Sequence, residues 1–323
     1  MHILIMNFDL DSFNYNLPQN LIAQKPRDIR SNSKLLVLSK NSSSKKEDYF
    51  YNLCNYLKSN DLLIFNNTKV IPARLFGHKK TGGKAEILFE RKISDYEFFA
   101  LIKNMGKTNT NNKIVVNDKY KIKVNKKIKN LFHCTSEDIK VLDLLNRFGN
   151  TPIPPYIKRH SSEIDKKRYQ TIYASIEGST AAPTAGLHFD EHVFEKMKSM
   201  SIEHSYCTLH IGLGTFSPLR SKKIDQNELH QEFYLIPRKT LEKIRKCKKN
   251  NGRVIAVGTT VVRALESFFL NQNMNTDKFY DTNIFIKPGF DFKIIDGLIT
   301  NFHLPKSSLI ILISAFHGIE NTL

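Results

Sequence analysis

Apolar runs of strand length recur in the two outer parts of the chain and predict a sheet. Residues 62–65 and 254–257 are apolar without interruption and 206–211 are mostly apolar, which is typical of strands buried on both faces, as in parallel sheets. Further runs of strand length cover residues 35–38, 282–286 and 309–313. We expect the last of these, 309–313, to be the strand that closes the sheet.

Helical spacing appears between these runs. Asp190 is a candidate N-cap, and Val193, Phe194 and Met197 follow it at helical intervals. Residues 241–247 predict a basic amphipathic surface helix. Residues 13–24 predict a short helix that is entered through Pro18, with Leu21 and Ile22 facing inward.

The middle of the chain has a different pattern. From Gly77 to about Phe148, short apolar runs such as 85–89 and 120–124 are separated by Asn, Gly and Lys turns, and no helical period persists before Glu137. This pattern predicts a small antiparallel barrel or sheet. The predicted fold class is therefore α/β, with a larger body that holds a mixed sheet (residues 1–76 and 149–323) and an inserted β-barrel-like domain (77–148).

Composition places the chain among ordinary globular proteins. Of its 323 residues 41% are hydrophobic and 25% are charged, and its four cysteines form no Cys-x-x-Cys pair. The start lacks the basic leader of a signal peptide, and Met6 is a candidate for the true start. We expect a cytoplasmic protein with reduced thiols, no metal and no membrane association.

The net charge of +18 favours an anionic partner such as nucleic acid. Abundant Lys, Asn and Ile are also what an A+T-rich genome encodes, so the charge alone does not define a site. Five lysines between 121 and 129 give the central region a basic face. That face either tracks an RNA backbone or protects a sheet edge.

The segment 179–189, STAAPTAGLHF, combines small residues with polar groups that can do chemistry. Its backbone can approach a ligand closely at Gly186, and Thr184 and His188 can contact it. A small-residue loop before a helix is the plainer interpretation. A second such turn, after a predicted strand that carries His210, contains Gly214 and Thr215, whose backbone N–H groups can face a ligand.

Two more turns carry candidate ligand-binding groups. Gly258, Thr259 and Thr260 join a predicted strand to a helix, which is the arrangement that binds carboxylates and phosphates. Arg263 on that helix either contacts the same anion or pairs with Glu266 one turn later. Near the C-terminus, a polar loop is predicted to hold four candidates: Asp296, Thr300, Asn301 and His303.

The proline-rich linker 151–159 holds its side chains in an extended conformation. An aromatic ring followed by basic groups suits a base to stack on and a phosphate to bind. The candidate RNA-binding residues are Tyr156, Lys158, Arg159 and, shortly after the linker, Arg168. Arg30 either binds a phosphate or carboxylate, or pairs with a neighbouring acid.

Several of these motifs together resemble the S-adenosylmethionine:tRNA ribosyltransferase-isomerases of queuosine biosynthesis. The resemblance rests on STAAPTAGLHF (179–189), LHIGLGTFSP (209–218), GRVIAVGTT (252–260) and DGLITNFHLP (296–305), and extends from about Phe13 to Phe316. The chain departs from the family at Asn227 and Leu229, where a His and a Met are usual, and at Lys34, where an Arg is usual. Family members also usually extend a few tens of residues further.

The resemblance implies that the ribosyl part of S-adenosylmethionine is joined to preQ1 at the wobble position of a tRNA, and that adenine and methionine are released. S-adenosylmethionine is then a consumed substrate, no cofactor is needed, and no obligate protein partner is expected. Proton transfer in this chemistry requires groups that titrate near neutrality. The candidate catalytic residues are His188, His210, His230, Glu232 and Asp296.

The resemblance leaves two alternatives open. A noncatalytic RNA-binding protein would account for the charge and for Tyr156 with Arg159, and a catalytically impaired remnant of the same enzyme would account for the shorter C-terminus. Each candidate histidine can also be a buried structural residue. Adenine release from the two substrates distinguishes these alternatives.

Overall fold

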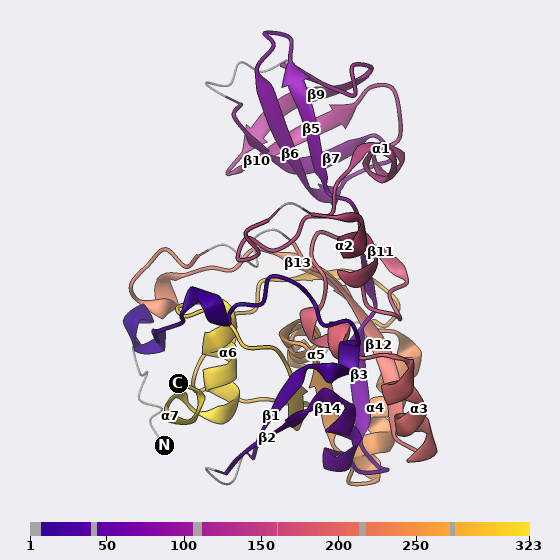
Figure 1. Ribbon diagram of the computed structural model, residues 1–323, viewed down its shortest axis with the longest axis vertical. Helices are drawn as coiled ribbons and strands as arrows, with labels where there is room; N and C mark the ends of the chain where they lie inside the picture. The colour runs from indigo at the N-terminus through magenta and orange to yellow at the C-terminus, as the bar shows by residue number, and fades with distance from the viewer. Residues whose placement is uncertain (1–7, 40–43, 106–111, 160, 213–217, 272–274) are drawn as a thin grey trace.

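The computed structural model describes residues 8–39, 44–105, 112–159, 161–212, 218–271 and 275–323. An α/β body contains both chain ends, and a six-stranded barrel stands at one end of it (Figure 1). The candidates Gly214 and Thr215 lie outside the described residues.

The body is built on a mixed six-stranded sheet with the order β15-β13-β12-β3-β14-β16. Four neighbours are parallel: β12 (Glu203–His210), β3 (Leu62–Asn66), β14 (Val254–Val257) and β16 (Gly297–Ile299). The other two, β13 (Glu232–Leu235) and β15 (Tyr280–Thr282), extend the sheet in antiparallel pairing. The predicted α/β fold class with a mixed sheet is confirmed.

The uninterrupted apolar runs arise because helices cover both faces of the sheet. Leu62 and Ile64 of β3 point into one core with α4 (Arg238–Lys249) and α5 (Thr259–Leu270). Leu63 and Phe65 point into the opposite core with α3 (Glu191–Ser199) and the 3-10 helix η4 (Phe50–Tyr56). Successive strand residues face opposite sides, so a strand covered on both must be apolar throughout.

The central region forms a closed barrel with the order β10-β7-β6-β5-β8-β9. Its alternating residues, such as Leu75, Ile87 and Phe98, fill the interior. The strands are β5 (Arg74–Lys79), β6 (Lys84–Lys92), β7 (Glu97–Lys103), β8 (Lys113–Val116), β9 (Tyr120–Ile128) and β10 (Leu131–Ser136), and α1 (Val141–Phe148) packs against the same core.

Barrel closure overturns one interpretation of the lysines between 121 and 129. Most of them lie on β9, which pairs with β8 on one side and β10 on the other. A strand with two neighbours has no open edge to protect. The edge-protection interpretation is therefore wrong.

Two predicted elements differ in the structure. Residues 309–313 belong to a helix, α6 (Ser308–His317), in which Ser307 caps the backbone N–H of Ile310. A short apolar run does not distinguish a buried strand from a buried helix, and here the cap decides. Residues 13–24 contain only the 3-10 turn η2 (Gln19–Leu21) after η1 (Leu10–Phe13), and Leu21 is 70% exposed instead of facing inward.

The predicted strand 282–286 is also displaced, since the observed β15 ends at Thr282. The remaining elements are short pairs and single turns. They are β1 (Lys34–Leu38) with β2 (Lys45–Tyr49), β4 (Thr68–Val70) with β11 (Ile176–Ser179), the helices α2 (Glu163–Arg168) and α7 (Ile319–Thr322), and the 3-10 helices η3 (Arg30–Asn32), η5 (Thr184–His188) and η7 (Ile224–Gln226). Within the described ranges, no helix has the length and apolar content that crossing a bilayer requires.

Candidate active site

Four parallel strands end at one edge of the body sheet, and most of the candidate residues lie there. His210 ends β12, Asn66 ends β3, Gly258 follows β14, and Thr300 follows β16. This edge lies on the side of the body toward the barrel (Figure 1). The chain leaves the carboxyl end of β3 and passes through β4 directly into the first barrel strand, β5. Ligand sites in α/β sheets form at the carboxyl ends of parallel strands. We call this the carboxyl edge.

The turn at Gly258 brings three segments together. Gly258 has φ of +100°, which favours glycine, and its N–H donates to Ile299 O at 2.8 Å. A Cβ at Gly258 would lie 3.8 Å from that of Ala185, so η5 packs against the turn. The candidates Thr259 and Thr260 begin α5 here, and Thr260 Oγ1 accepts a hydrogen bond from Asn66 Nδ2 at 3.3 Å.

The imidazole of His188 bridges two segments that are distant in sequence. Its Nε2 lies 2.8 Å from Asn301 Nδ2 and its Nδ1 lies 2.9 Å from Ser33 Oγ. The amide donates in this arrangement, so Nε2 accepts and the ring proton is on Nδ1. Burial, followed by the charge of Arg30, lowers the pKa of His188 to about 4. The ring is therefore neutral at pH 7.

His210 is held on three sides. Its Nδ1 lies 2.7 Å from Thr68 Oγ1, and its ring stacks on Phe279 at 5.3 Å between centroids. A Cβ at Gly178 would lie 2.8 Å from the ring, so only glycine permits this contact. Burial lowers the pKa of His210 to about 4. No hydrogen bond to its Nε2 comes from the described residues, which leaves that nitrogen available to a ligand.

His303 lies two residues beyond Asn301 at the same edge. Its Nε2 is 3.0 Å from Thr300 Oγ1, and its backbone carbonyl accepts the hydroxyl of Tyr15. Burial lowers the pKa of His303 to about 4. Three neutral imidazoles thus lie at the carboxyl edge.

A buried ion pair lies beside these groups. Arg263 Nη1 pairs with Glu232 Oε2, and Arg263 Nε donates to Ile284 O at 3.3 Å. Both side chains are less than 7% exposed, and Arg263 Nη2 is buried without a hydrogen-bond partner among the described residues. Glu232 is therefore engaged with Arg263 and is not a freely placed base. The Nη2 hydrogens are available to an anion.

The predicted alternative pairing of Arg263 with Glu266 is wrong. Glu266 accepts the backbone N–H groups of residues 293–295 at 2.8 to 3.2 Å. Spacing along a helix places two residues on one face, but the loop that packs against that face decides the partners.

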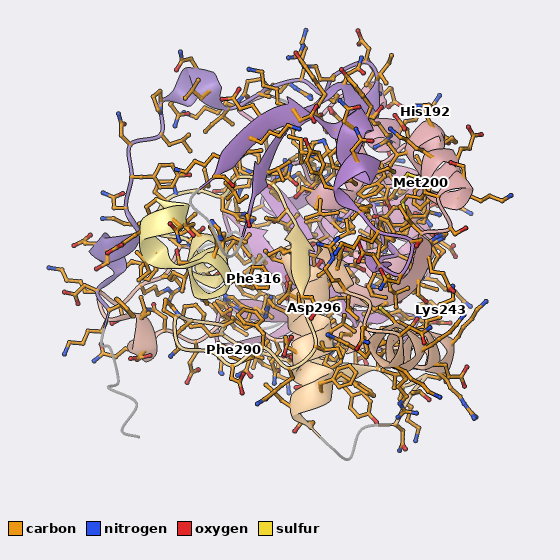
Figure 2. The ribbon with its side chains drawn as sticks, turned by 90° about the horizontal axis from the view of Figure 1, so that it is seen from below. His192, Met200, Lys243, Phe290, Asp296 and Phe316 are labelled. Carbon is orange, nitrogen blue, oxygen red and sulfur yellow. The ribbon has the colours of Figure 1, made fainter. Side chains whose placement is uncertain are left out.

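One catalytic candidate lies at the opposite edge of the sheet. Asp296 precedes β16, at the opposite edge of the sheet, where it accepts Val254 N at 2.7 Å and pairs with Lys248 at 2.6 Å. It is labelled in Figure 2, which is viewed from below, the side away from the barrel. The predicted single loop from Asp296 to His303 is interrupted by the strand β16. His230 is exposed in the segment that leads into β13, whose Phe233 pairs with His210 at the carboxyl edge.

The arginines of the predicted RNA-binding set mainly fix the chain. Arg159 makes a two-pronged ion pair with Asp165 at 2.6 and 2.8 Å and donates to Gln24 O. Arg168 donates to the carbonyls of Arg27 and Asp28. Lys158 is exposed, whereas Tyr156 is partly buried. Arg30 donates to the carbonyls of Leu187 and Gln170 at 3.0 and 2.9 Å, with longer bonds to those of Lys167 and Arg168, and these carbonyls take the place of the predicted acidic partner.

Several residues at the edge carried no sequence signal of a site. The barrel reaches the edge through Glu90, whose Oε1 would lie 2.6 Å from a Cβ at Gly212, and through Arg91, which lies over the Phe233 ring at 5.5 Å. The predicted Gly186 is required sterically, since a Cβ there would lie 2.0 Å from the Tyr173 hydroxyl. Ser33, which follows η3, and Thr68, which begins β4, bond to the imidazoles, but each is an ordinary polar residue of its segment. Only tertiary contacts identify them.

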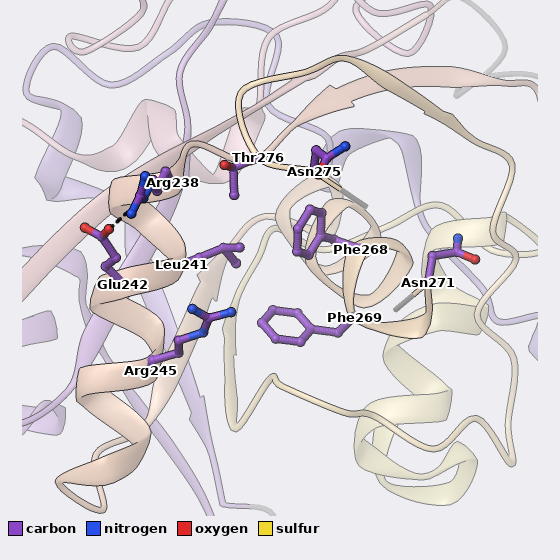
Figure 3. Close-up of a pocket in the computed structure, with 9 residues that line it drawn as sticks. All are labelled: Arg238, Leu241, Glu242, Arg245, Phe268, Phe269, Asn271, Asn275 and Thr276. Atoms are coloured by element: carbon purple, nitrogen blue, oxygen red, sulfur yellow. Dashed lines mark hydrogen bonds and ion pairs between the residues drawn. The ribbon is translucent and has the colours of Figure 1, made fainter. Parts of the chain in front are cut away.

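No three His, Cys, Asp or Glu side chains in the described part of the chain are grouped to hold a metal ion. A pocket of about 540 Å³ opens between α4 and the end of α5, away from the carboxyl edge (Figure 3). Its lining includes Arg245, Leu241 and Phe269, and none of the catalytic candidates. The candidate site is therefore defined by the edge cluster and not by this pocket.

Known proteins resemble this chain over most of its length. The family model described as "Queuosine biosynthesis protein" matches residues 10–323. A protein of Buchnera aphidicola, named S-adenosylmethionine:tRNA ribosyltransferase-isomerase, is 44% identical over 320 residues, which cover 97% of this chain and 90% of the relative. A protein of Coxiella burnetii with the same name is 44% identical over 309 residues, covering 95% and 90%.

A solved structure has a similar fold over most of its length. It is the S-adenosylmethionine tRNA ribosyltransferase of Thermotoga maritima, with a TM-score of 0.52 and 28% identity over 96% of this chain and 91% of that one. The family model covers nearly the whole described sequence, including all segments of the carboxyl edge. The chain therefore belongs to the queuosine biosynthesis protein family.

Proposed function

We propose that this protein is an S-adenosylmethionine:tRNA ribosyltransferase-isomerase. It transfers and isomerises the ribosyl part of S-adenosylmethionine onto the aminomethyl group of preQ1 in a tRNA anticodon, and it releases adenine and methionine. The names of its relatives support the reaction class. The observation that carries the proposal for this chain is that segments distant in sequence bring the imidazoles of His188, His210 and His303 to one sheet edge.

The imidazoles suit the proton transfers that the reaction requires. A proton must leave the carbon beside the sulfonium or the attacking amine, and adenine must gain one as it departs. Burial lowers the pKa of His210 to about 4, below the near-neutral value that general acid–base catalysis favours, so His210 is a weaker base than a free imidazole. Its Nε2 is nevertheless available to accept a proton while Thr68 holds Nδ1. We assign proton transfer to His210. We assign the positioning of the ligand to the neighbouring pair of His188 and Asn301, in which Asn301 also holds the imidazole of His188 in place.

The methionine carboxylate fits the start of α5. The first N–H groups of a helix have no intrahelical partner and carry the positive end of its dipole. Thr259 and Thr260 supply these groups, and Arg263 adds a buried Nη2 without a partner among the described residues. Glu232 keeps Arg263 oriented.

The test is incubation of the protein with S-adenosylmethionine and tRNA that carries preQ1, with adenine release as the readout. The expected result is adenine release that depends on both substrates, and its loss in His188→Ala and His210→Ala proteins that remain folded. Absence of adenine release by the folded wild-type protein would contradict the proposal. Normal turnover by His188→Ala would remove that residue from the mechanism.

A further inference from the structure

One aromatic ring at the carboxyl edge is almost entirely in solvent. Phe302 is 86% exposed, although its sequence neighbours Asn301 and His303 are both partly buried. Burying a phenylalanine side chain contributes about 1.5–3 kcal/mol, and the fold forgoes that contribution here. A single exposed apolar residue is common, but one held inside a cluster of candidate catalytic groups calls for a partner.

The exposure of Phe302 is fixed by its surroundings and does not come from a loose loop. Before it, Asn301 bonds to His188 at 2.8 Å and Ile299 O accepts the Gly258 N–H. After it, Leu304 O accepts the hydroxyl of Ser307 at 2.7 Å. The backbone of His303 is anchored by Tyr15, and that of Lys306 by Phe13 at 2.9 Å. The ring is thus presented outward by a backbone that is anchored on both sides.

We propose that Phe302 is a stacking platform for a planar base, and specifically for an unpaired base of the tRNA anticodon loop. Sequence-specific RNA recognition targets loops whose unstacked bases lie on aromatic side chains. Stacking requires an open ring face beside the reaction site, which is what Phe302 offers. A basic protein of net charge +18 attracts the phosphates, whereas an aromatic ring contacts the bases themselves.

Two sources of a planar purine-type ring are present in the proposed reaction, the tRNA and the adenine of S-adenosylmethionine. The exposure of Phe302 favours the larger ligand, because a ring that faces solvent is available to a macromolecule without rearrangement. The inference rests on the proposed function for the identity of the RNA. It does not depend on turnover, so binding and turnover are measured separately.

The experiment measures the Kd for a fluorescent anticodon stem–loop RNA that carries preQ1, and the Kd for S-adenosylmethionine by equilibrium dialysis. Phe302→Ala is expected to raise the RNA Kd about 5- to 150-fold, the range that loss of one base stack gives. The Kd of Phe302→Ala for S-adenosylmethionine is expected to stay within about twofold of the wild-type value. Phe302→Tyr is expected to retain RNA binding, whereas Phe302→Leu, which is apolar but not aromatic, is not.

A matched control is Phe76→Ala, because Phe76 is also exposed (55%) but lies on the outer side of the barrel strand β5. It is expected to bind the RNA as the wild type does. Stacking releases no counterions, so Phe302→Ala is expected to leave the slope of log Kd against log salt unchanged.

An unchanged RNA Kd in Phe302→Ala would overturn the inference. So would a rise in the Kd for S-adenosylmethionine alone, which would assign the ring to adenine, or an equal loss for both ligands, which would indicate a collapsed loop. If the wild type binds the RNA through Phe302 but releases no adenine, the proposed function fails and the stacking site stands. If it releases adenine and Phe302→Ala binds normally, only the stacking site fails.

Discussion

The two edges of the body sheet contain similar residue types but use them differently. At the amino edge, Asp61 pairs with Arg253 at 2.5 Å and accepts Lys58 N, and Asp296 pairs with Lys248 and accepts Val254 N. At the carboxyl edge, three imidazoles are neutral, and Arg263 Nη2, Asn301 Oδ1 and the Tyr173 hydroxyl are buried without partners among the described residues.

We infer from this difference that the polar groups of the amino edge stabilise the fold, whereas those of the carboxyl edge bind a ligand. Buried polar groups are normally satisfied within the protein, so a group of unsatisfied ones at one edge indicates a place for a ligand. At the amino edge, Asp61 and Asp296 are paired with Arg253 and Lys248, and none of these four described residues has a buried side-chain atom without a partner. The candidate site therefore lies at the carboxyl ends of the parallel strands, as in other α/β folds.

The largest expected contrast is between His210 and Asp296. His210→Ala is expected to lower kcat about 10²- to 10⁴-fold, because the proposed proton transfer loses its imidazole. Asp296→Asn, at the other edge, is expected to leave kcat within a small factor and to lower stability by about 1 kcal/mol, the typical value of a hydrogen-bonded pair. Adenine release and urea unfolding of the two variants measure this contrast, and a comparable loss of kcat in both would erase it.

The ion pair of the carboxyl edge is expected to matter for stability as well. Glu232→Leu leaves the Arg263 charge buried without its carboxylate, and we expect a loss of about 3–5 kcal/mol in the free energy of unfolding. The double variant Glu232→Leu/Arg263→Met is expected to recover most of this stability but not the activity. If the double variant were as unstable as the single one, the pair would not be the cause.

Acid is expected to destabilise the protein in part through the imidazoles of the carboxyl edge. The pKa values of His188, His210 and His303 lie near 4 in the folded protein, below the ordinary value of 6.5. The unfolded chain thus binds more protons between these values. The stabilisation is complete above pH 6.5 and is lost as the pH falls toward 4, by at most about 1.4 kcal/mol per pH unit for each imidazole.

The measurement is the free energy of unfolding against pH for the wild type and for His210→Asn. The variant is expected to have a shallower slope between pH 4 and 6.5. Parallel curves would contradict the assignment of a buried, neutral His210.

The smallest expected effect concerns the linker. Lys158 is exposed, whereas the guanidinium of Arg159 is engaged with Asp165. Lys158→Ala is expected to weaken tRNA binding a few-fold and to reduce the salt slope by about 1, as for one phosphate contact. Lys239→Ala, an exposed position on α4, is the control and is expected to change neither.

Local patterns were sufficient for the elements whose surroundings they reflect. The apolar runs of β3 and β14 predicted buried strands, because burial on both faces leaves few polar positions. The run 309–313 did not reveal that it is helical, since five apolar residues fit either element. The resemblance motifs similarly located the turns at Gly258 and Asn301 but not their partners.

The sequence by itself determined that this chain has an α/β body, an inserted β-rich region and clustered polar turns, since these depend on residue order and short-range periodicity. Only the tertiary structure decided which turns meet. The three-residue strand β16 separates Asp296 from Asn301, so that they lie at opposite edges of the sheet. Arg263 pairs with Glu232 on β13 instead of with Glu266 on its own helix. Such contacts join residues far apart in sequence, and the packing of whole elements, not local preference, brings them within hydrogen-bonding distance.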